Sequence, residues 1–103
     1  MKYMLTWWER PTGSYFDYEG AQQRVLGVFH KWEMPASLQI HQFVVRVGEL
    51  GGYAVIETDQ PADIHRLSTV FAVFRFRLEP VLEVGEAVAT EAAAIAWRSA
   101  MSN

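Results

Sequence analysis

The spacing of the apolar residues changes several times along this chain. Apolar residues at every second position are typical of strands, and recurrence at three and four residues is typical of amphipathic helices. Strand-like patterns cover 2–8, 38–47, 53–58 and 74–84, and helical patterns cover 15–33, 59–71 and 85–100. This order predicts an α+β fold of the ferredoxin-like β-α-β-β-α-β type, with a four-stranded antiparallel sheet and a C-terminal helix.

Glycine and proline sharpen this prediction at three places. The stretch G-E-L-G-G at 48–52 predicts a turn, so the strands on either side of it should form a hairpin. Pro80 cannot donate a hydrogen bond to a neighbouring strand, which predicts that the last strand lies at a sheet edge. Gly27 costs the first helix about 1 kcal/mol relative to alanine, and it suggests a close crossing with the sheet.

The composition limits the classes of function. A chain of 103 residues is expected to form one domain, 1–103, and without cysteine it has neither disulfides nor thiolate chemistry. The net charge is −3 and the basic residues are scattered, so no nucleic-acid partner is expected. Neither a signal peptide nor an apolar run of the roughly 20 residues that span a bilayer is evident, so we expect a cytoplasmic protein with no membrane partner.

Both faces of the predicted sheet are apolar. The first strand places Tyr3, Leu5 and Trp7 on one face and Met4, Thr6 and Trp8 on the other. A sheet with helices on one face only should be polar on the other, so the second face needs a cover. The C-terminal helix could cover part of it, and we expect a second copy to cover the rest in a homodimer through the open sheet face. The alternative is a monomer with this helix folded over the open face.

Four stretches of the chain resemble a known family. They are M-K-Y-M-L-T-W at 1–7, H-Q-F-V at 41–44, G-G-Y-A-V-I-E-T-D at 51–59 and E-P-V-L at 79–82. They resemble a bacterial family of short proteins that open with M-K-[YF]-M-x-T-W, a domain of unknown function in the dimeric α+β-barrel superfamily. The resemblance covers essentially the whole chain, and it implies a ferredoxin-like protomer that pairs sheet to sheet.

The same resemblance implies no activity. The wider superfamily includes cofactor-free quinone-forming monooxygenases, haem-degrading enzymes, muconolactone isomerase-like and polyketide-cyclase-like proteins, and stress proteins without known catalysis. Fold-level analogy of this breadth is a weak argument for any one function, so the function has to be argued from the site.

A histidine in an apolar strand is the main candidate for chemistry. Alternation along S-L-Q-I-H-Q-F-V-V-R-V, residues 37–47, predicts that Gln39, His41 and Phe43 share one face. His41 could then act in a pocket as a general base, with Gln39 holding its tautomer. The alternative is a structural histidine that is satisfied by a backbone carbonyl or a dimer contact. Glu57 is expected to pair with Arg46 or Arg77.

Aromatic residues are numerous for a core of this size. We expect most of them to be core, but an aromatic-lined cavity with a few polar groups is also what small apolar ligands occupy. The candidate ligand-binding residues besides Gln39 are Phe43, Trp7, Tyr53 and Trp32. No metal is expected, because His30 and Glu33 are three residues apart on a helix without a third ligand nearby.

Two functions remain open at this point. One is a small-ligand binding or accessory protein with an aromatic-lined apolar pocket, whose ligand is a small aromatic molecule. The alternative is a cofactor-independent enzyme, monooxygenase-, isomerase- or cyclase-like, acting on a phenolic or polyketide-like substrate. In that case His41 is the general base, and Gln39, Trp7 or Tyr53 positions the substrate. Neither reading requires a cofactor, and the pattern alone does not decide whether the protein is an enzyme.

Overall fold

Four antiparallel strands and three helices make up the protein in a computed structural model, which describes residues 1–10 and 15–101 and only the backbone of 15–18. The elements are β1 (Lys2–Glu9), α1 (Tyr15–Lys31), β2 (Gln39–Val45), β3 (Gly51–Glu57), α2 (Pro61–Val70), β4 (Phe74–Val81) and α3 (Val84–Met101). The strands lie in the order β2-β3-β1-β4, and each neighbouring pair is antiparallel. The predicted α+β class, the antiparallel sheet and the order of elements are confirmed.

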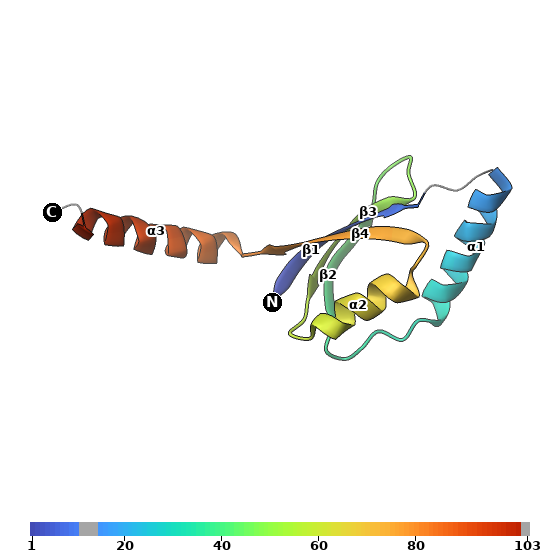
Figure 1. The fold of residues 1–103 in the computed structure, drawn as a ribbon, viewed down its shortest axis with the longest axis horizontal. Helices are drawn as coiled ribbons and strands as arrows, with labels where there is room; N and C mark the ends of the chain where they lie inside the picture. Colours follow the sequence, from blue (N-terminus) through green and yellow to red (C-terminus); the bar gives the residue numbers. More distant parts are fainter. Residues whose placement is uncertain (11–14, 102–103) are drawn as a thin grey trace.

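The strand register divides the sheet into two faces. Leu5 of β1 lies opposite Ala54 of β3 and Leu78 of β4, and this row belongs to the face that α1 and α2 cover, which we call the covered face (Figure 1). The opposite face, which we call the open face, alternates with it along each strand. Its residues include Met4, Thr6, Trp8, Gln39, Val44, Tyr53, Val55, Glu57, Arg75, Arg77 and Glu79. β4 with Pro80 is an edge strand, as predicted.

The hydrophobic core lies between the covered face and the helices. Leu67 in α2 and Phe71 just after it pack onto the strands, because residues four apart lie on the same face of a helix. The buried apolar residues of this cluster are Leu5, Trp7, Leu38, Ala54, Ile56, Leu67, Phe71 and Phe74. Burial on this scale stabilises the fold by about 1.5 to 3 kcal/mol for each large side chain.

A buried threonine organises the start of α2. Thr58 directly follows β3, and its Oγ1 accepts a hydrogen bond of 3.0 Å from the backbone nitrogen of Gln60. The same hydroxyl donates to the Asp63 carboxylate at 2.7 Å, in the first turn of the helix. Pro61 begins the helix, where a residue without an N–H group causes no loss of hydrogen bonding. The strand-to-helix connection is therefore held by side chains as well as by the chain itself.

α1 covers its side of the sheet incompletely. Leu26 is 68% exposed and Phe29 is 53% exposed, although both belong to the apolar stripe of this helix. The prediction that α1 crosses the sheet closely at Gly27 is wrong, because a Cβ atom at this position would have no neighbouring atom within 4 Å. Space therefore remains between α1 and the sheet.

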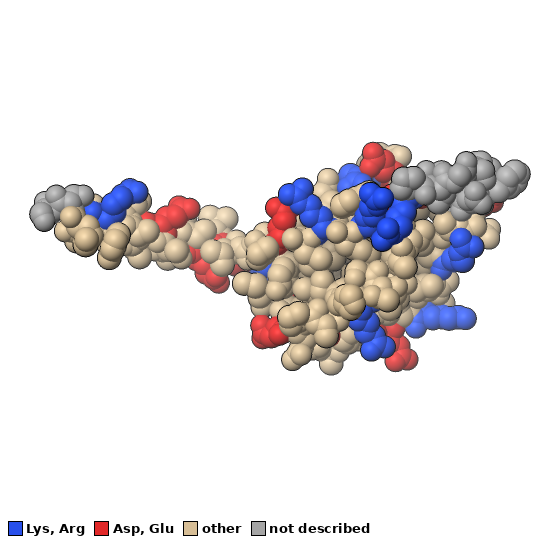
Figure 2. Space-filling view, viewed as in Figure 1, with Lys and Arg blue, Asp and Glu red and all other residues tan. Residues whose placement is uncertain are grey.

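α3 extends away from the sheet and the other helices (Figure 1), and with it the molecule measures 68 × 29 × 19 Å along its principal axes. None of the residues of α3 is buried, so this helix does not cover the open face. The prediction that it could cover part of this face is not met in this structure. Figure 2 shows that most of its visible surface is uncharged. Within the described residues, no helix is both long enough and apolar enough to cross a membrane.

Candidate functional site

A β-bulge in β2 decides which side chains share a face. Ile40 lies opposite Ile56 of β3, but Gln42 lies opposite Val55, so His41 is an extra residue in this strand. An extra residue reverses the alternation beyond it. Phe43 consequently lies opposite Ala54 on the covered face. The prediction that Gln39, His41 and Phe43 share one face is therefore wrong for Phe43.

An apolar pocket lies between the covered face and the two helices α1 and α2. Its volume is about 260 Å³, and every surface that lines it is apolar. Residues from β1, β2, β3, β4, α1 and α2 contribute to it, and they include Leu5, Trp7, Val25, Phe29, Trp32, Phe43, Ala54, Ile56, Phe71 and Phe74. We refer to this cavity as the apolar pocket.

Aromatic rings form much of the wall of the apolar pocket. The ring of Trp7 stacks on that of Phe43, with centroids 5.7 Å apart and planes 14° apart, and it meets Phe74 edge-on at 4.8 Å. Phe71 contacts Phe29 at 6.3 Å and Trp32 at 5.4 Å. Offset and edge-on pairs each stabilise by about 0.5 to 1.5 kcal/mol beyond the burial of their area. Trp7 and Phe74 are buried and form the floor of the pocket.

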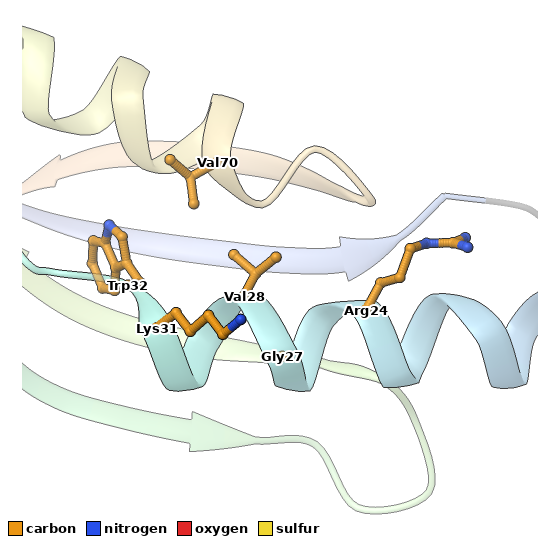
Figure 3. A pocket seen from close by; sticks show the side chains of 6 residues that line it. All are labelled: Arg24, Gly27, Val28, Lys31, Trp32 and Val70. Carbon is orange, nitrogen blue, oxygen red and sulfur yellow. The ribbon is translucent and has the colours of Figure 1, made fainter.

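The mouth of the apolar pocket is formed by β2 and α1. Phe43 is 49% exposed and its neighbour across the opening, Phe29, is 6.1 Å away from it between ring centroids. A second hollow of about 450 Å³ lies between α1 and α2, and it is shallow and widely open to solvent. Figure 3 shows Val28 and Val70 pointing toward each other there, with Arg24 and Lys31 on the α1 side. The more enclosed apolar pocket is the better candidate for a ligand.

Polar side chains gather on the open face, at the end of the sheet where β1 begins. His41 Nε2 lies 2.7 Å from Glu57 Oε1, and the carboxylate accepts the hydrogen bond. Glu57 therefore pairs with His41, and the predicted pairing with Arg46 or Arg77 is wrong. Gln39 lies directly opposite Glu57 on the neighbouring strand, so it belongs to the same group.

Lys2 extends this polar group to the start of α3. It pairs with Glu83, and this hydrogen bond is the main reason why the pKa of Lys2 is raised and that of Glu83 is lowered. Elsewhere, Arg46 lies 5.4 Å from the ring centre of Tyr53, and its hydrogen bond with Glu49 raises the pKa of the guanidinium. Among the residues that the structure describes, no three histidine or acidic side chains gather in a way that could hold a metal ion.

The chain was compared with known families and proteins. The model of a family described as a domain of unknown function (DUF3303) matches residues 1–95. The chain belongs to the DUF3303 family. No curated protein matches it. The family description names no ligand, reaction or partner, so the function of this DUF3303 protein has to be inferred from its own geometry.

The six predicted site residues divide between the two faces of this DUF3303 chain. Trp7, Phe43 and Trp32 line the apolar pocket, whereas Gln39, His41 and Tyr53 do not line it. Gln39 and Tyr53 lie on the open face by strand register, and His41 meets Glu57 there. The pocket also includes four aromatic residues that were not among the predicted site residues, Phe29, Phe71, Phe74 and Phe76.

Proposed function

We propose that this DUF3303 protein binds a small, predominantly apolar aromatic molecule in the apolar pocket. The single observation that carries this proposal is a cavity of about 260 Å³ whose lining is apolar throughout and includes seven aromatic residues. A cavity of this size suits a ligand of one or two rings, somewhat below the range of about 300 to 1,000 Å³ for drug-sized ligands. A charged or phosphorylated ligand is disfavoured, because it would lose its hydration without gaining a polar partner.

The expected affinity is modest. Burial of about 200 Å² of apolar ligand surface would contribute about 5 kcal/mol, before the loss of translational and rotational freedom is counted. The pocket offers stacking but no hydrogen bond, so selectivity would follow ring shape and size more than functional groups. This behaviour fits a binding or accessory role better than a reaction at the pocket itself.

We also propose that a second copy of the chain covers the open face. Several apolar side chains remain exposed there, among them Val44 at 43% and Tyr53 at 41%. An isologous contact would bury this patch on both copies at once. The resemblance to the dimeric α+β-barrel superfamily supports this arrangement, in which two ferredoxin-like protomers pair sheet to sheet.

A cofactor-independent enzyme is the second candidate function, and the pairing of His41 with Glu57 favours it. A carboxylate that accepts a hydrogen bond from one imidazole nitrogen orients the ring and leaves the other nitrogen for proton transfer. In the proposed dimer, the imidazole would face a space between two sheets, and a phenolic or polyketide-like substrate could bind there. This function would use the open face, whereas the binding function uses the apolar pocket.

Ligand binding is tested by titrating the protein with naphthol and naphthoquinone while following tryptophan fluorescence. Trp7 lines the apolar pocket, so we expect saturable quenching in the wild type. Phe43→Ala should weaken binding about tenfold or more, because it removes a stacked ring from the wall. Val44→Ala is the matched control, since this residue is similarly exposed but lies on the opposite face, and it should bind as the wild type does. Equal binding by both variants would contradict the proposed site.

The enzyme alternative is tested separately with His41→Gln and Glu57→Gln. Product formation from a panel of phenolic substrates, lost in both variants while naphthol binding is retained, would favour catalysis on the open face. Turnover that is unchanged in both variants would exclude His41 as the general base. Dimer formation is measured by light scattering of the wild type at micromolar concentration, where a stable mass near 11.8 kDa would contradict the proposed dimer.

A further inference from the structure

α3 is apolar on more than one side and has no cover in its own chain. Its large apolar residues are all more than half exposed, with Val88 at 56% and Trp97 at 67%. At 100° per residue, Val84, Val88 and Ile95 lie on one side of the helix together with Glu91, whereas Trp97 lies about 160° and Met101 about 120° away from them. A helix with large apolar residues on more than one side normally packs against more than one other element. Exposure on both sides therefore indicates a missing partner surface.

The connection to β4 directs α3 away from its own sheet. Glu83 is one of the two residues between β4 and α3, and its carboxylate pairs with Lys2 of β1. Its backbone carbonyl accepts a hydrogen bond of 3.0 Å from the nitrogen of Ala87, so the helix begins at this anchored residue. The pair with Lys2 therefore ties the residue that precedes α3 to the start of β1.

The open face of another copy has the size and the chemistry to receive α3. An 18-residue helix is about 27 Å long, and an eight-residue strand such as β1 spans about 26 Å. The open face presents apolar side chains along its middle, including Trp8 and Val55, and the basic residues Arg75 and Arg77 along β4. The first half of α3 carries Glu91 on the same side as Val84, Val88 and Ile95, and its charge is opposite to that of Arg75, whereas Arg77 pairs with Glu79 of its own strand.

We propose that α3 is exchanged between two copies of the chain, each α3 packing across the open sheet face of the other copy. The stripe of Val84, Val88 and Ile95 contacts the partner's sheet near Val55. Trp97 and Met101 lie on the side of the helix that faces away from this sheet. Reciprocal exchange covers an apolar helix and an apolar sheet face on each copy by one two-fold contact. This inference rests on the proposed dimer through the open face and is independent of ligand binding in the apolar pocket.

Pairs of single-cysteine variants test the exchange, because the natural chain contains no cysteine. Val88→Cys places a thiol on the α3 stripe, and Val55→Cys places one on the open face. The two full-length proteins are mixed, allowed to exchange subunits and treated with a short bismaleimide. We expect a linked product that contains one chain of each kind. Val44→Cys, on the adjacent strand, repeats the measurement in case Val55→Cys disturbs folding.

The matched control is Ala62→Cys, an exposed residue in the first turn of α2, on the other side of the sheet. It should not link to Val88→Cys. Links between two Val55→Cys chains alone would overturn the exchange of α3 while leaving the sheet-to-sheet dimer intact, as would links between two Val88→Cys chains alone. A link within one chain of the Val55→Cys/Val88→Cys double variant at high dilution would show α3 folded back and overturn the proposal. A monomeric mass without links would overturn both the exchange and the dimer.

Discussion

The covered and open faces of the sheet differ in what they carry, although both are built from the same four strands. On the covered face, Trp7, Phe43 and Phe74 pack ring to ring around an apolar pocket. On the open face, His41 bonds to Glu57 and the neighbouring Lys2 bonds to Glu83. The aromatic pocket and the group of hydrogen-bonding side chains therefore lie on opposite sides of the sheet.

This separation follows from one extra residue in β2. With regular alternation from Ile40 onward, His41 and Phe43 would both point to the open face, and Phe43 would be missing from the wall of the apolar pocket. The bulge at His41 turns Phe43 toward Trp7 and leaves the imidazole beside Glu57. A binding function and a proton-transfer function can consequently be tested independently in this protein, since each depends on a different face.

Of the substitutions that test how the two faces are built, Gly52→Ala is expected to change the free energy of unfolding most. Gly52 lies opposite Trp7, and a Cβ atom there would overlap the carbonyl oxygen of Val44 in β2. Because the obstacle is backbone, the two strands would have to separate, and we expect a loss of about 3 kcal/mol or more of unfolding free energy. Urea denaturation measures this loss. Gly85→Ala in α3, with no atom within 4 Å, is the control and should not destabilise the protein.

A smaller effect, with the opposite sign, is expected from Gly27→Ala in the helix that covers the pocket. The site is exposed and has room for a Cβ atom, so alanine should stabilise α1 by about 0.5 to 1 kcal/mol. The rise should appear in the urea midpoint. Better order in α1 should also leave naphthol affinity equal or higher, because Phe29 on this helix lines the pocket. A lower midpoint would mean that Gly27 is needed for a close contact.

His41→Phe tests whether the two faces act independently. The side chains of His41 and Glu57 are 32% and 44% exposed, so the loss of their bond should cost less than about 1 kcal/mol. Naphthol affinity should not change, since His41 does not line the apolar pocket. Thermal melts with and without naphthol measure both quantities. A variant that folds but no longer binds naphthol would show that the ligand site includes the open face.

The smallest expected effect is the pH dependence of the ion pair between Lys2 and Glu83, which precedes α3. The pKa of Glu83 is lowered by Lys2, so the stabilisation that this pair gives is present above the ordinary value of 4.5 and is lost as pH falls through the lowered pKa. The pKa of Lys2 is raised by Glu83, so the stabilisation is also lost as pH rises past 10.5 and through the raised pKa. Between these limits the first turn of α3 should be unaffected by pH.

NMR shifts of the Ala87 and Val88 amides during an acid titration would measure this change. We expect Glu83→Gln to remove the acid step, because an amide does not titrate. A step that persists in this variant would assign the titration to another group, such as the adjacent Glu86, and would contradict the role of Glu83 in it. Glu79→Gln, which changes a carboxylate further along β4, is the control and should retain the step.

Much of the fold could be predicted from local patterns. The alternation of Tyr3, Leu5 and Trp7 assigned the faces of β1 correctly, and Pro80 identified β4 as an edge strand. These features depend on the residues of one element, so the pattern of that element carries them. Of the candidate site, the aromatic members Trp7, Phe43 and Trp32 were recognised, because large apolar residues in a small chain must share a core.

The bulge at His41, the pairing of Glu57 and the direction of α3 were decided by tertiary structure alone. A bulge is defined only relative to the partner strand. Three positions separate Ile40 from Phe43 in β2, whereas two separate their partners in β3, and this difference appears only when the two strands are paired. In the sequence, Arg46 and Arg77 were equally good candidates to pair with Glu57. In the folded sheet, His41 lies within hydrogen-bond distance of Glu57 instead. The residue before α3 is joined to β1 by the pair of Glu83 and Lys2, a contact between residues 81 positions apart in the chain. Sequence periodicity reports which side of an element is apolar, whereas the surface that side meets is set by contacts between distant segments.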